Sequence, residues 1–185
     1  MEALADYTKI EIISGVEYNM SPANTKHITI QGNLFNIIRN FLKGKQCRVF
    51  TEIGVDFDED NYLVPDLVIV CDRNKITPKG ISGTPDFVVE VLSTSSKKKD
   101  RALKKDIYEK FGVKEYWIID PKAESIEAYI LRNGKYELDG VYHNMDESEI
   151  DLKHMNESEK AEIKLSLKIS LYDDLDIQTK DIFEE

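Results

Sequence analysis

A chain of 185 residues, 41% hydrophobic and 32% charged, is long enough for one globular domain with its own core, and this composition excludes wholesale disorder. The formal net charge of −10 opposes non-specific binding of nucleic acid by the chain as a whole. No apolar run approaches the ~20 residues of a membrane helix and no secretory signal is visible, so we expect a cytoplasmic protein without a membrane partner.

The first third of the chain predicts a hairpin, a helix and two strands. Ser14-Gly15 marks the turn of a short hairpin, and residues 21–25 offer helix-capping side chains. Apolar residues then recur at helical spacing up to Gly44, namely Ile30, Leu34, Ile37, Ile38, Phe41 and Leu42. Residues 48–57 alternate with a period of two, which predicts one strand, and residues 63–72 predict a second strand after a turn.

The rest of the chain continues with alternating element types. An apolar run at 87–92 predicts a third strand, residues 93–112 a helix, and residues 115–120 a fourth strand. Asn133-Gly134 is typical of a two-residue hairpin turn. We expect residues 139–162 to form an exposed acidic loop and residues 162–175 to supply a last strand. This order predicts a single α/β domain over residues 1–185, with a mixed central sheet flanked by helices and an added β-hairpin.

The two cysteines, Cys47 and Cys71, lie in apolar segments with strand-like patterns. We expect two buried reduced thiols rather than a disulfide, which agrees with a cytoplasmic location. Two cysteines at this separation give no zinc-site spacing.

Two acidic residues interrupt apolar strands, and these strands follow one another in the chain. Asp66 precedes Leu67-Val68-Ile69-Val70, and Glu90 lies inside the run 87–92. A buried charge costs several kcal/mol unless it is paired, protonated or metal-bound. If the two strands pair, the carboxylates can stand side by side and bind Mg²⁺ or Mn²⁺ through hard oxygen ligands.

The helix after the third strand offers a cation for the same site. Asp100, Lys104 and Tyr108 are spaced at i, i+4 and i+8 and therefore share one side of this helix. A lysine on that side could stabilise negative charge at a phosphorus centre or position an attacking water. The basic run at 97–105 could form a phosphate-binding ridge, although a solvated helix start explains it as well.

The residues Pro65-Asp66 and Glu90-Val91-Leu92 resemble the pattern of the PD-(D/E)XK nuclease superfamily, with Leu92 where that pattern has lysine. The longer runs PDLVIVCD, GTPDFVVEVLSTSS and GVKEYWIIDP, together with MSPANTKH upstream, are very similar to the Uma-two family of restriction-endonuclease-like proteins. The resemblance covers roughly residues 7–138, with a weaker similarity at 174–183.

This resemblance implies a restriction-endonuclease-like core and a metal-dependent endonuclease that hydrolyses phosphodiester bonds of DNA. It implies metal ligation by Asp66 and Glu90 and a relocated catalytic lysine, best matched by Lys104. Nuclease cores of this kind often cleave duplexes as dimers, so a homodimer is compatible with it, although no sequence feature identifies an interface.

Further candidates each have a plain structural alternative. His27 could reach the site or cap a helix, Glu52 could be a further ligand or face solvent, and Tyr108 could pack in the core or touch the site. The whole fold could also be a catalytically degenerate nuclease that acts as a nucleic-acid or protein interaction module. A glycosidase with two catalytic carboxylates is a third hypothesis, but it requires an aromatic-lined cleft, and Trp117 lies in a core-like strand.

Overall fold

A mixed six-stranded sheet forms the centre of the structure. The computed structural model describes residues 9–93, 99–145 and 164–184, with the backbone alone for residues 99–101. The central sheet has the order β12-β11-β10-β9-β6-β3, in which β9 and β10 are parallel and the other neighbouring pairs of described strands are antiparallel. Its strands are β3 (Arg48–Thr51), β6 (Leu67–Val70), β9 (Phe87–Val91), β10 (Glu115–Asp120), β11 (Ser125–Arg132) and β12 (Lys135–His143).

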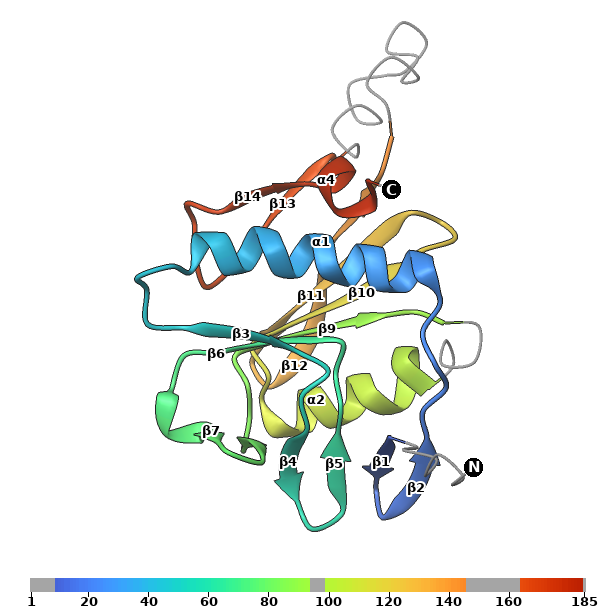
Figure 1. Cartoon of the computed structure of the whole chain (residues 1–185), viewed down its shortest axis with the longest axis vertical. Coiled ribbons are helices and arrows are strands. Elements are labelled where there is room, and N and C mark those ends of the chain that lie inside the picture. Colours follow the sequence, from blue (N-terminus) through green and yellow to red (C-terminus); the bar gives the residue numbers. More distant parts are fainter. Residues whose placement is uncertain (1–8, 94–98, 146–163, 185) are drawn as a thin grey trace, which may run out of the picture.

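Two helices cover opposite faces of this sheet (Figure 1). Helix α1 (Thr25–Phe41) begins at Asn24, whose side chain accepts the backbone N–H of His27 at 2.9 Å. Helix α2 (Lys105–Phe111) follows the π-helical segment η2 (Lys99–Lys104) and ends at Gly112, which has a φ of 79°. The parallel pair β9 and β10 is connected through η2 and α2, as a parallel connection requires a crossover.

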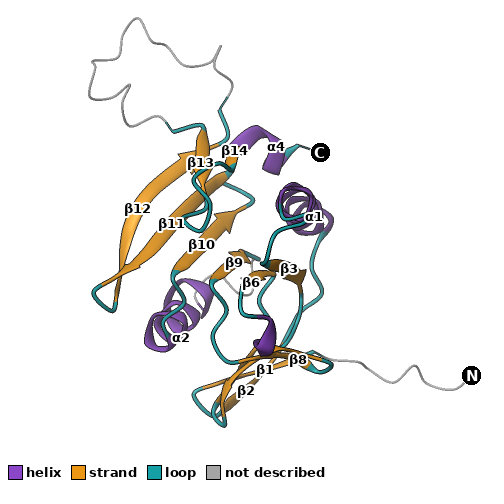
Figure 2. Cartoon of the chain, turned by 90° about the vertical axis from the view of Figure 1, so that its left-hand side faces the viewer, coloured by secondary structure: helices purple, strands orange, loops and turns teal. Residues whose placement is uncertain are grey.

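A second six-stranded sheet lies on the same side of the central sheet as α2, next to this helix (Figures 1 and 2). Its order is β2-β1-β5-β4-β8-β7, with β1 (Ile10–Ile13), β2 (Val16–Asn19), β4 (Val55–Asp58), β5 (Asn61–Leu63), β7 (Ile76–Thr77) and β8 (Gly80–Ser82). The short helix η1 (Arg73–Lys75) precedes β7. The C-terminal residues add β13 (Ser166–Lys168), β14 (Asp176–Gln178) and α4 (Thr179–Phe183), which packs near α1.

The alternation of side chains divides the core into two clusters, one on each face of the central sheet. Phe87 and Val89 of β9 pack in the cluster that contains the apolar face of α1, Ile30, Leu34 and Ile38. Val88 and Leu92 pack in the cluster that contains Ile107 and Tyr108 of α2. The β9 residues are all buried, so a charged side chain within this strand lies deep in the protein.

Two predicted strands are wrong as single elements, because the chain leaves one sheet for the other in the middle of each. Residues 48–57 divide into β3 and β4, with Glu52 at a φ of 50° between them. Residues 63–72 contain only the last residue of β5, Leu63, and then β6, with Val64, Pro65 and Asp66 at the crossing. The period-two pattern continues through the break in 48–57, and the second segment is a nearly continuous apolar run, so neither pattern reveals the break.

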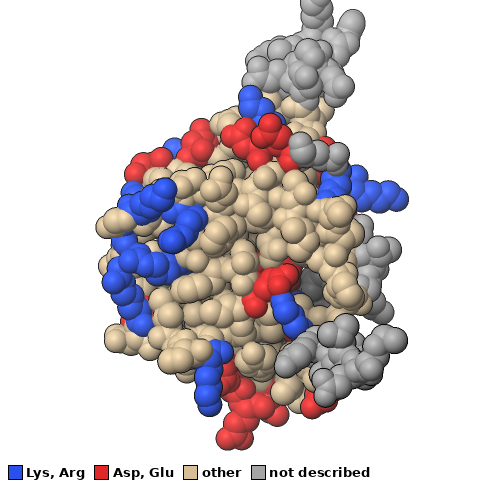
Figure 3. Space-filling model, in the orientation of Figure 1, with Lys and Arg blue, Asp and Glu red and all other residues tan. Residues whose placement is uncertain are grey.

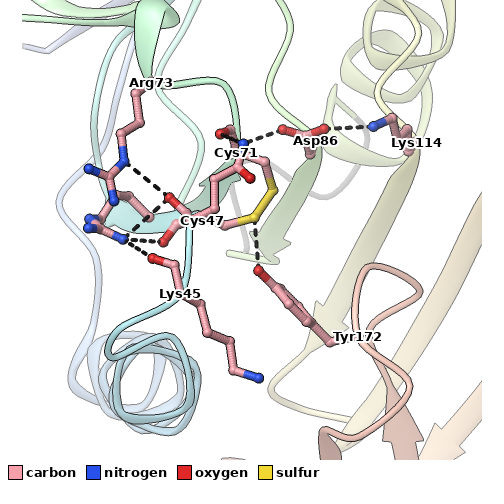
Figure 4. The surroundings of a disulfide bond; sticks show 9 residues. Lys45, Cys47, Cys71, Arg73, Asp86, Lys114 and Tyr172 are labelled. Atoms are coloured by element: carbon pink, nitrogen blue, oxygen red, sulfur yellow. Dashed lines mark hydrogen bonds and ion pairs between the residues drawn. A yellow bond between two sulfur atoms is a disulfide. The ribbon is translucent and has the colours of Figure 1, made fainter.

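The expectation of two reduced thiols is also wrong, because Cys47 and Cys71 form a disulfide (Figure 4). Strands β3 and β6 are antiparallel, with Arg48 opposite Val70. The next pair in this register is Cys47 and Cys71, whose Cα atoms lie 3.9 Å apart. Strand register therefore brings the two sulfur atoms together.

The remaining boundaries differ in smaller ways. Strand β12 extends to His143, so residues 139–143 of the expected acidic loop belong to a strand, and residues 146–163 lie outside the described part. The last strand, expected within 162–175, is the short β13, and it pairs with β14, which follows that range. The predicted helix start at 93–96 falls mostly on residues outside the described part, and the helical turns are seen from Lys99. Among the described helices, none has the length and apolar character needed to span a membrane.

Alanine at two glycines should have opposite effects on stability, because Gly80 lies against the chain where it passes between the sheets and Gly32 lies on an open helix surface. Gly80 has a φ of 144°, and a Cβ there would lie 2.4 Å from the carbonyl oxygen of Gly54, so Gly80→Ala should lower the free energy of unfolding by about 1–3 kcal/mol. Gly32 is an exposed residue of α1 with nothing within 4 Å of a Cβ, so Gly32→Ala should raise it by about 0.5–1 kcal/mol. Urea denaturation of both variants measures these changes, and equal effects would contradict the close approach of residues 54 and 80.

Candidate active site

Asp66 and Glu90 lie opposite one another where β6 begins and β9 ends. The two strands are antiparallel neighbours with Leu67 opposite Val89, so the next pair in this register is Asp66 and Glu90. Asp66 is 8% exposed and Glu90 is 3% exposed. The strand pairing that the sequence analysis required for a shared site is therefore present.

The Asp66 carboxylate is fixed by β9 and by the first turn of α1. Its Oδ2 accepts the backbone N–H of Val91 at 2.6 Å, and its Oδ1 lies 3.1 Å from Nε2 of His27. The backbone carbonyl of Asp66 accepts a hydrogen bond from Nε2 of Gln31 at 2.7 Å. His27 thus lies beside one of the two acids, held there by the Asn24 cap of its helix.

Glu90 is bound by two side chains from the following helical segment. Its Oε1 accepts hydrogen bonds from Nζ of Lys104 at 3.0 Å and from the hydroxyl of Tyr108 at 2.6 Å. Burial and then the neighbouring Glu90 carboxylate raise the pKa of the Tyr108 hydroxyl well above its ordinary value. Tyr108 therefore remains protonated and keeps donating to Glu90 throughout the neutral range.

A third carboxylate, Glu11 of β1, completes this network and was missed by the sequence analysis. Its Oε1 lies 2.8 Å from Nζ of Lys104 and also accepts the backbone N–H of Val64 at 3.1 Å. Glu11 is 1% and Lys104 3% exposed, so one buried ammonium lies between two buried carboxylates. Glu11 interrupts the apolar run of Ile10, Ile12 and Ile13 just as Glu90 interrupts its own strand, and this signal could have identified it.

The other candidates are placed differently. The side chain of Glu52 forms an ion pair with Lys9 at the surface, and only its backbone N–H reaches the site, where it donates to the carbonyl of Asp66 at 3.3 Å. The side chain of Asp100 lies outside the described part, as do Lys97 and Lys98 of the basic run. Leu92, at the lysine position of the superfamily pattern, is buried in the apolar cluster next to α2. Gln31 carried no signal, because a polar residue within a helix is ordinary.

A further buried acid, Glu115, belongs to the opposite face of the sheet. It accepts hydrogen bonds from Nε1 of Trp117 at 2.6 Å and from the backbone and hydroxyl of Ser170 at 2.7 and 2.6 Å. Burial raises the pKa of Glu115. Trp117 is fully buried against Phe87, so it cannot line the sugar cleft that a glycosidase would require.

Asp66 and Glu90 are the candidate donors for a metal ion. Within the described ranges, no group of three or more His, Cys, Asp or Glu side chains is arranged to hold a metal ion. Magnesium often binds proteins through one or two carboxylates, with water and substrate phosphate as the other ligands. The chemistry of Asp66 and Glu90 therefore fits such an ion, although Lys104 now neutralises Glu90.

Comparison with known proteins identifies the family. The model of the Uma2 family, described as "Putative restriction endonuclease", matches residues 1–155. The chain belongs to the Uma2 family. An uncharacterised protein of Synechocystis sp. is 25% identical over 159 residues, which cover 84% of this chain and 77% of that protein.

A solved structure has the same fold as this Uma2 protein. The crystal structure of a "putative nuclease belonging to DUF820" from Anabaena variabilis superposes with a TM-score of 0.71 at 22% sequence identity. The match covers 94% of this chain and 89% of the other chain. The predicted α/β class with a restriction-endonuclease-like core is confirmed.

The buried network predicts a large loss of stability when its cation is removed. Lys104→Met leaves Glu11 and Glu90 as neighbouring buried carboxylates without a counter-charge, and the free energy of unfolding should fall by about 3–5 kcal/mol in urea denaturation. Adding Glu11→Gln to this variant should restore part of the loss, because one buried charge is then removed.

The matched control for this prediction is Lys110→Met. Lys110 is an exposed lysine of α2. Its side chain is 61% exposed, and its Nζ lies 3.9 Å from Oδ2 of Asp58. An exposed ion pair of this kind contributes at most about 1 kcal/mol. Equal losses for Lys104→Met and Lys110→Met would show that the buried network does not stabilise the fold.

Proposed function

We propose that this Uma2 protein is a divalent-metal-dependent endonuclease that hydrolyses phosphodiester bonds of DNA, with Asp66 and Glu90 as metal ligands and Lys104 as the catalytic cation. The observation that carries the proposal is the strand register that places Asp66 opposite Glu90, together with the buried lysine bound to Glu90. Asp66 and Glu90 are opposed across β6 and β9, and Nζ of Lys104 lies 3.0 Å from Glu90. Membership of a family described as restriction endonucleases supports the choice of reaction.

Mg²⁺ or Mn²⁺ at the two carboxylates would activate a water molecule and neutralise charge on the phosphate. Asp66 suits the role of ligand because the Val91 N–H and His27 fix its orientation. Glu90 suits it because two donors from one helical segment hold its carboxylate at the strand end.

Lys104 has the role of the lysine that the superfamily pattern places where this chain has Leu92. Its ammonium group reaches Glu90 from a neighbouring helical segment, whereas Leu92 fills the core. An ammonium there would stabilise the negative charge that develops on the phosphate oxygens during hydrolysis. Tyr108, which remains protonated, would keep Glu90 in place without competing for the phosphate.

A second function, a catalytically degenerate module for nucleic-acid or protein interaction, is favoured by one specific observation. Lys104 already pairs with both Glu11 and Glu90, so Glu90 has a positive partner without a metal ion. A thermal-shift titration with Mn²⁺ discriminates the two functions. The nuclease should be stabilised by Mn²⁺ with saturation, and Asp66→Asn should lose this effect, whereas an interaction module should show no metal-dependent shift.

The nuclease predicts metal-dependent cleavage of plasmid DNA that requires the two acids. Purified protein should nick or linearise supercoiled plasmid with Mg²⁺ or Mn²⁺, and EDTA should stop the reaction. Glu90→Gln and Asp66→Asn should each lower the rate at least ~100-fold, because each removes a metal ligand.

The matched control is Glu137→Gln, an exposed acid of β12 that is ion-paired with Arg132. It should cleave at the wild-type rate, and thermal melting should verify that every variant is folded. Wild-type cleavage by Glu90→Gln would refute the assignment of the site.

Moving the lysine tests its role separately from the metal ligands. Residues 90 and 92 share one face of their strand, so Lys104→Met/Leu92→Lys should return an ammonium group to Glu90 and recover part of the cleavage lost in Lys104→Met. Lys104→Met/Leu92→Met is the uncharged control and should stay inactive. Equal activity of the two double variants would mean that no lysine is needed at this site.

A further inference from the structure

Basic side chains gather at the end of the central sheet away from the carboxylates. The C-terminal part of α1, the segment leading into β3 and the helix η1 lie side by side there, and Lys and Arg dominate that edge of the molecule (Figures 1 and 3). We name the set Arg39, Lys43, Arg48, Arg73 and Lys75 the basic surface. Arg39, Lys43 and Arg73 are exposed, whereas Arg48 and Lys75 are half-buried.

The positive charge of the basic surface is not compensated by carboxylates. Arg48 donates to the carbonyls of Lys45 and Cys47 at 2.7 and 2.8 Å, and Arg73 donates to the carbonyl of Gln46 at 3.4 Å. Carbonyl groups are neutral, so these bonds fix the guanidinium groups without cancelling their charge. Within the described ranges, none of the five forms an ion pair with Asp or Glu.

Several cations elsewhere on the described surface do have acidic partners. Lys114 pairs with Asp86, Arg132 with Glu137 and Asp139, and Lys135 with Glu109, as is expected for a chain whose net charge is −10. Lys45, next to the basic surface, also has one, Asp174 at 3.4 Å. The basic surface thus brings neighbouring cations together without acidic partners within the described ranges, and this produces a local positive potential.

The basic surface is held in shape by covalent and polar bonds. The disulfide ties Cys47, beside Arg48, to Cys71, two residues before Arg73 (Figure 4). Nε2 of Gln46 also donates to the carbonyl of Cys71 at 3.0 Å. Arg39, Lys43 and Arg48 line a pocket of about 180 Å³ between the end of α1 and the start of β3. Cations that are already ordered bind a multivalent anion with less loss of conformational entropy.

Strand β3 connects the basic surface to the candidate active site. Arg48 begins β3, and Thr51 at its other end pairs with Leu67, next to Asp66. Three strand residues span about 10 Å, which corresponds to about three base-pair steps of a duplex. A duplex whose backbone contacts the basic surface can therefore also present a phosphate near Asp66 and Glu90.

We propose that the basic surface binds the sugar-phosphate backbone of duplex DNA on one side of the cleavage site. The choice of DNA as the bound polyanion rests on the proposed nuclease function. The charge and the rigidity of the surface are independent of that function. Contacts to phosphates carry no sequence information, so this surface supplies affinity and orientation for any duplex.

Binding of a fluorescent 20-base-pair duplex, measured by anisotropy in EDTA so that no cleavage occurs, tests this proposal. Arg39→Glu/Lys43→Glu changes two exposed cations whose side chains form no hydrogen bond or ion pair within the described ranges, and it should weaken binding at least ~10-fold at 100 mM salt. The slope of log K against log salt concentration should fall by about 2, one for each lost phosphate contact.

The control is Lys168→Glu/Lys180→Glu, two exposed lysines on β13 and α4 that change the net charge by the same amount. Its affinity for the duplex should lie within about threefold of the wild-type affinity, because salt screens charges that lie far from the bound duplex. The proposal would be overturned if Arg39→Glu/Lys43→Glu bound the duplex with wild-type affinity, or if the control variant lost as much affinity as Arg39→Glu/Lys43→Glu. Binding of phosphatidylserine vesicles in place of the duplex would overturn it as well.

The outcomes separate this proposal from the nuclease function. Cleavage that needs Glu90, together with unchanged binding by Arg39→Glu/Lys43→Glu, would refute the basic surface alone. Binding that depends on the basic surface, without any cleavage by the wild type, would support the surface and refute the nuclease.

Discussion

One buried ammonium group holds the candidate site together. Lys104 lies between Glu11 of the second sheet and Glu90 of the central sheet, and it reaches both from the segment that leads into α2. The N-terminal hairpin, strand β9 and the segment before α2 therefore meet at one charge. A pair of buried carboxylates cannot remain ionised side by side without such a partner, so the position of η2 and the packing of β1 depend on this contact.

The same contact explains why the lysine can be absent from position 92. The ammonium group beside Glu90 comes from a different element than the strand of Glu90. Leu92, at the strand position, is apolar and contributes to the core, while the helical segment supplies the cation.

Local patterns predicted most of the elements, and the fold class followed from their order. The Asn133-Gly134 hairpin and the strand around Glu90 have signals within a few residues, and the structure contains both. Asp66 and Glu90 could be paired from sequence because their strands are consecutive. The disulfide could not be predicted, since it depends on the register of β3 with β6 and a shift of one residue would separate the sulfur atoms.

The breaks at Glu52 and at Pro65 were missed for a related reason. Residues 48–57 keep one alternation of side chains across their break, whereas β6 is apolar throughout because its two faces pack in the two clusters, so neither pattern marks where the chain changes sheets. Glu11 was missed although its signal was visible, since its partners lie far along the chain. The sequence shows that a buried charge is present, whereas only the tertiary structure shows what compensates it.

The position of Glu11 on the N-terminal hairpin affects how the functional unit of this protein should be delimited. The motif residues that resemble the nuclease superfamily all lie after the hairpin, from Pro65 onward. A shortened chain that begins at helix α1 would keep every one of them and the whole central sheet. It would nevertheless leave Lys104 with a single carboxylate and open the buried network to water, so the hairpin belongs to the site as much as the strands do.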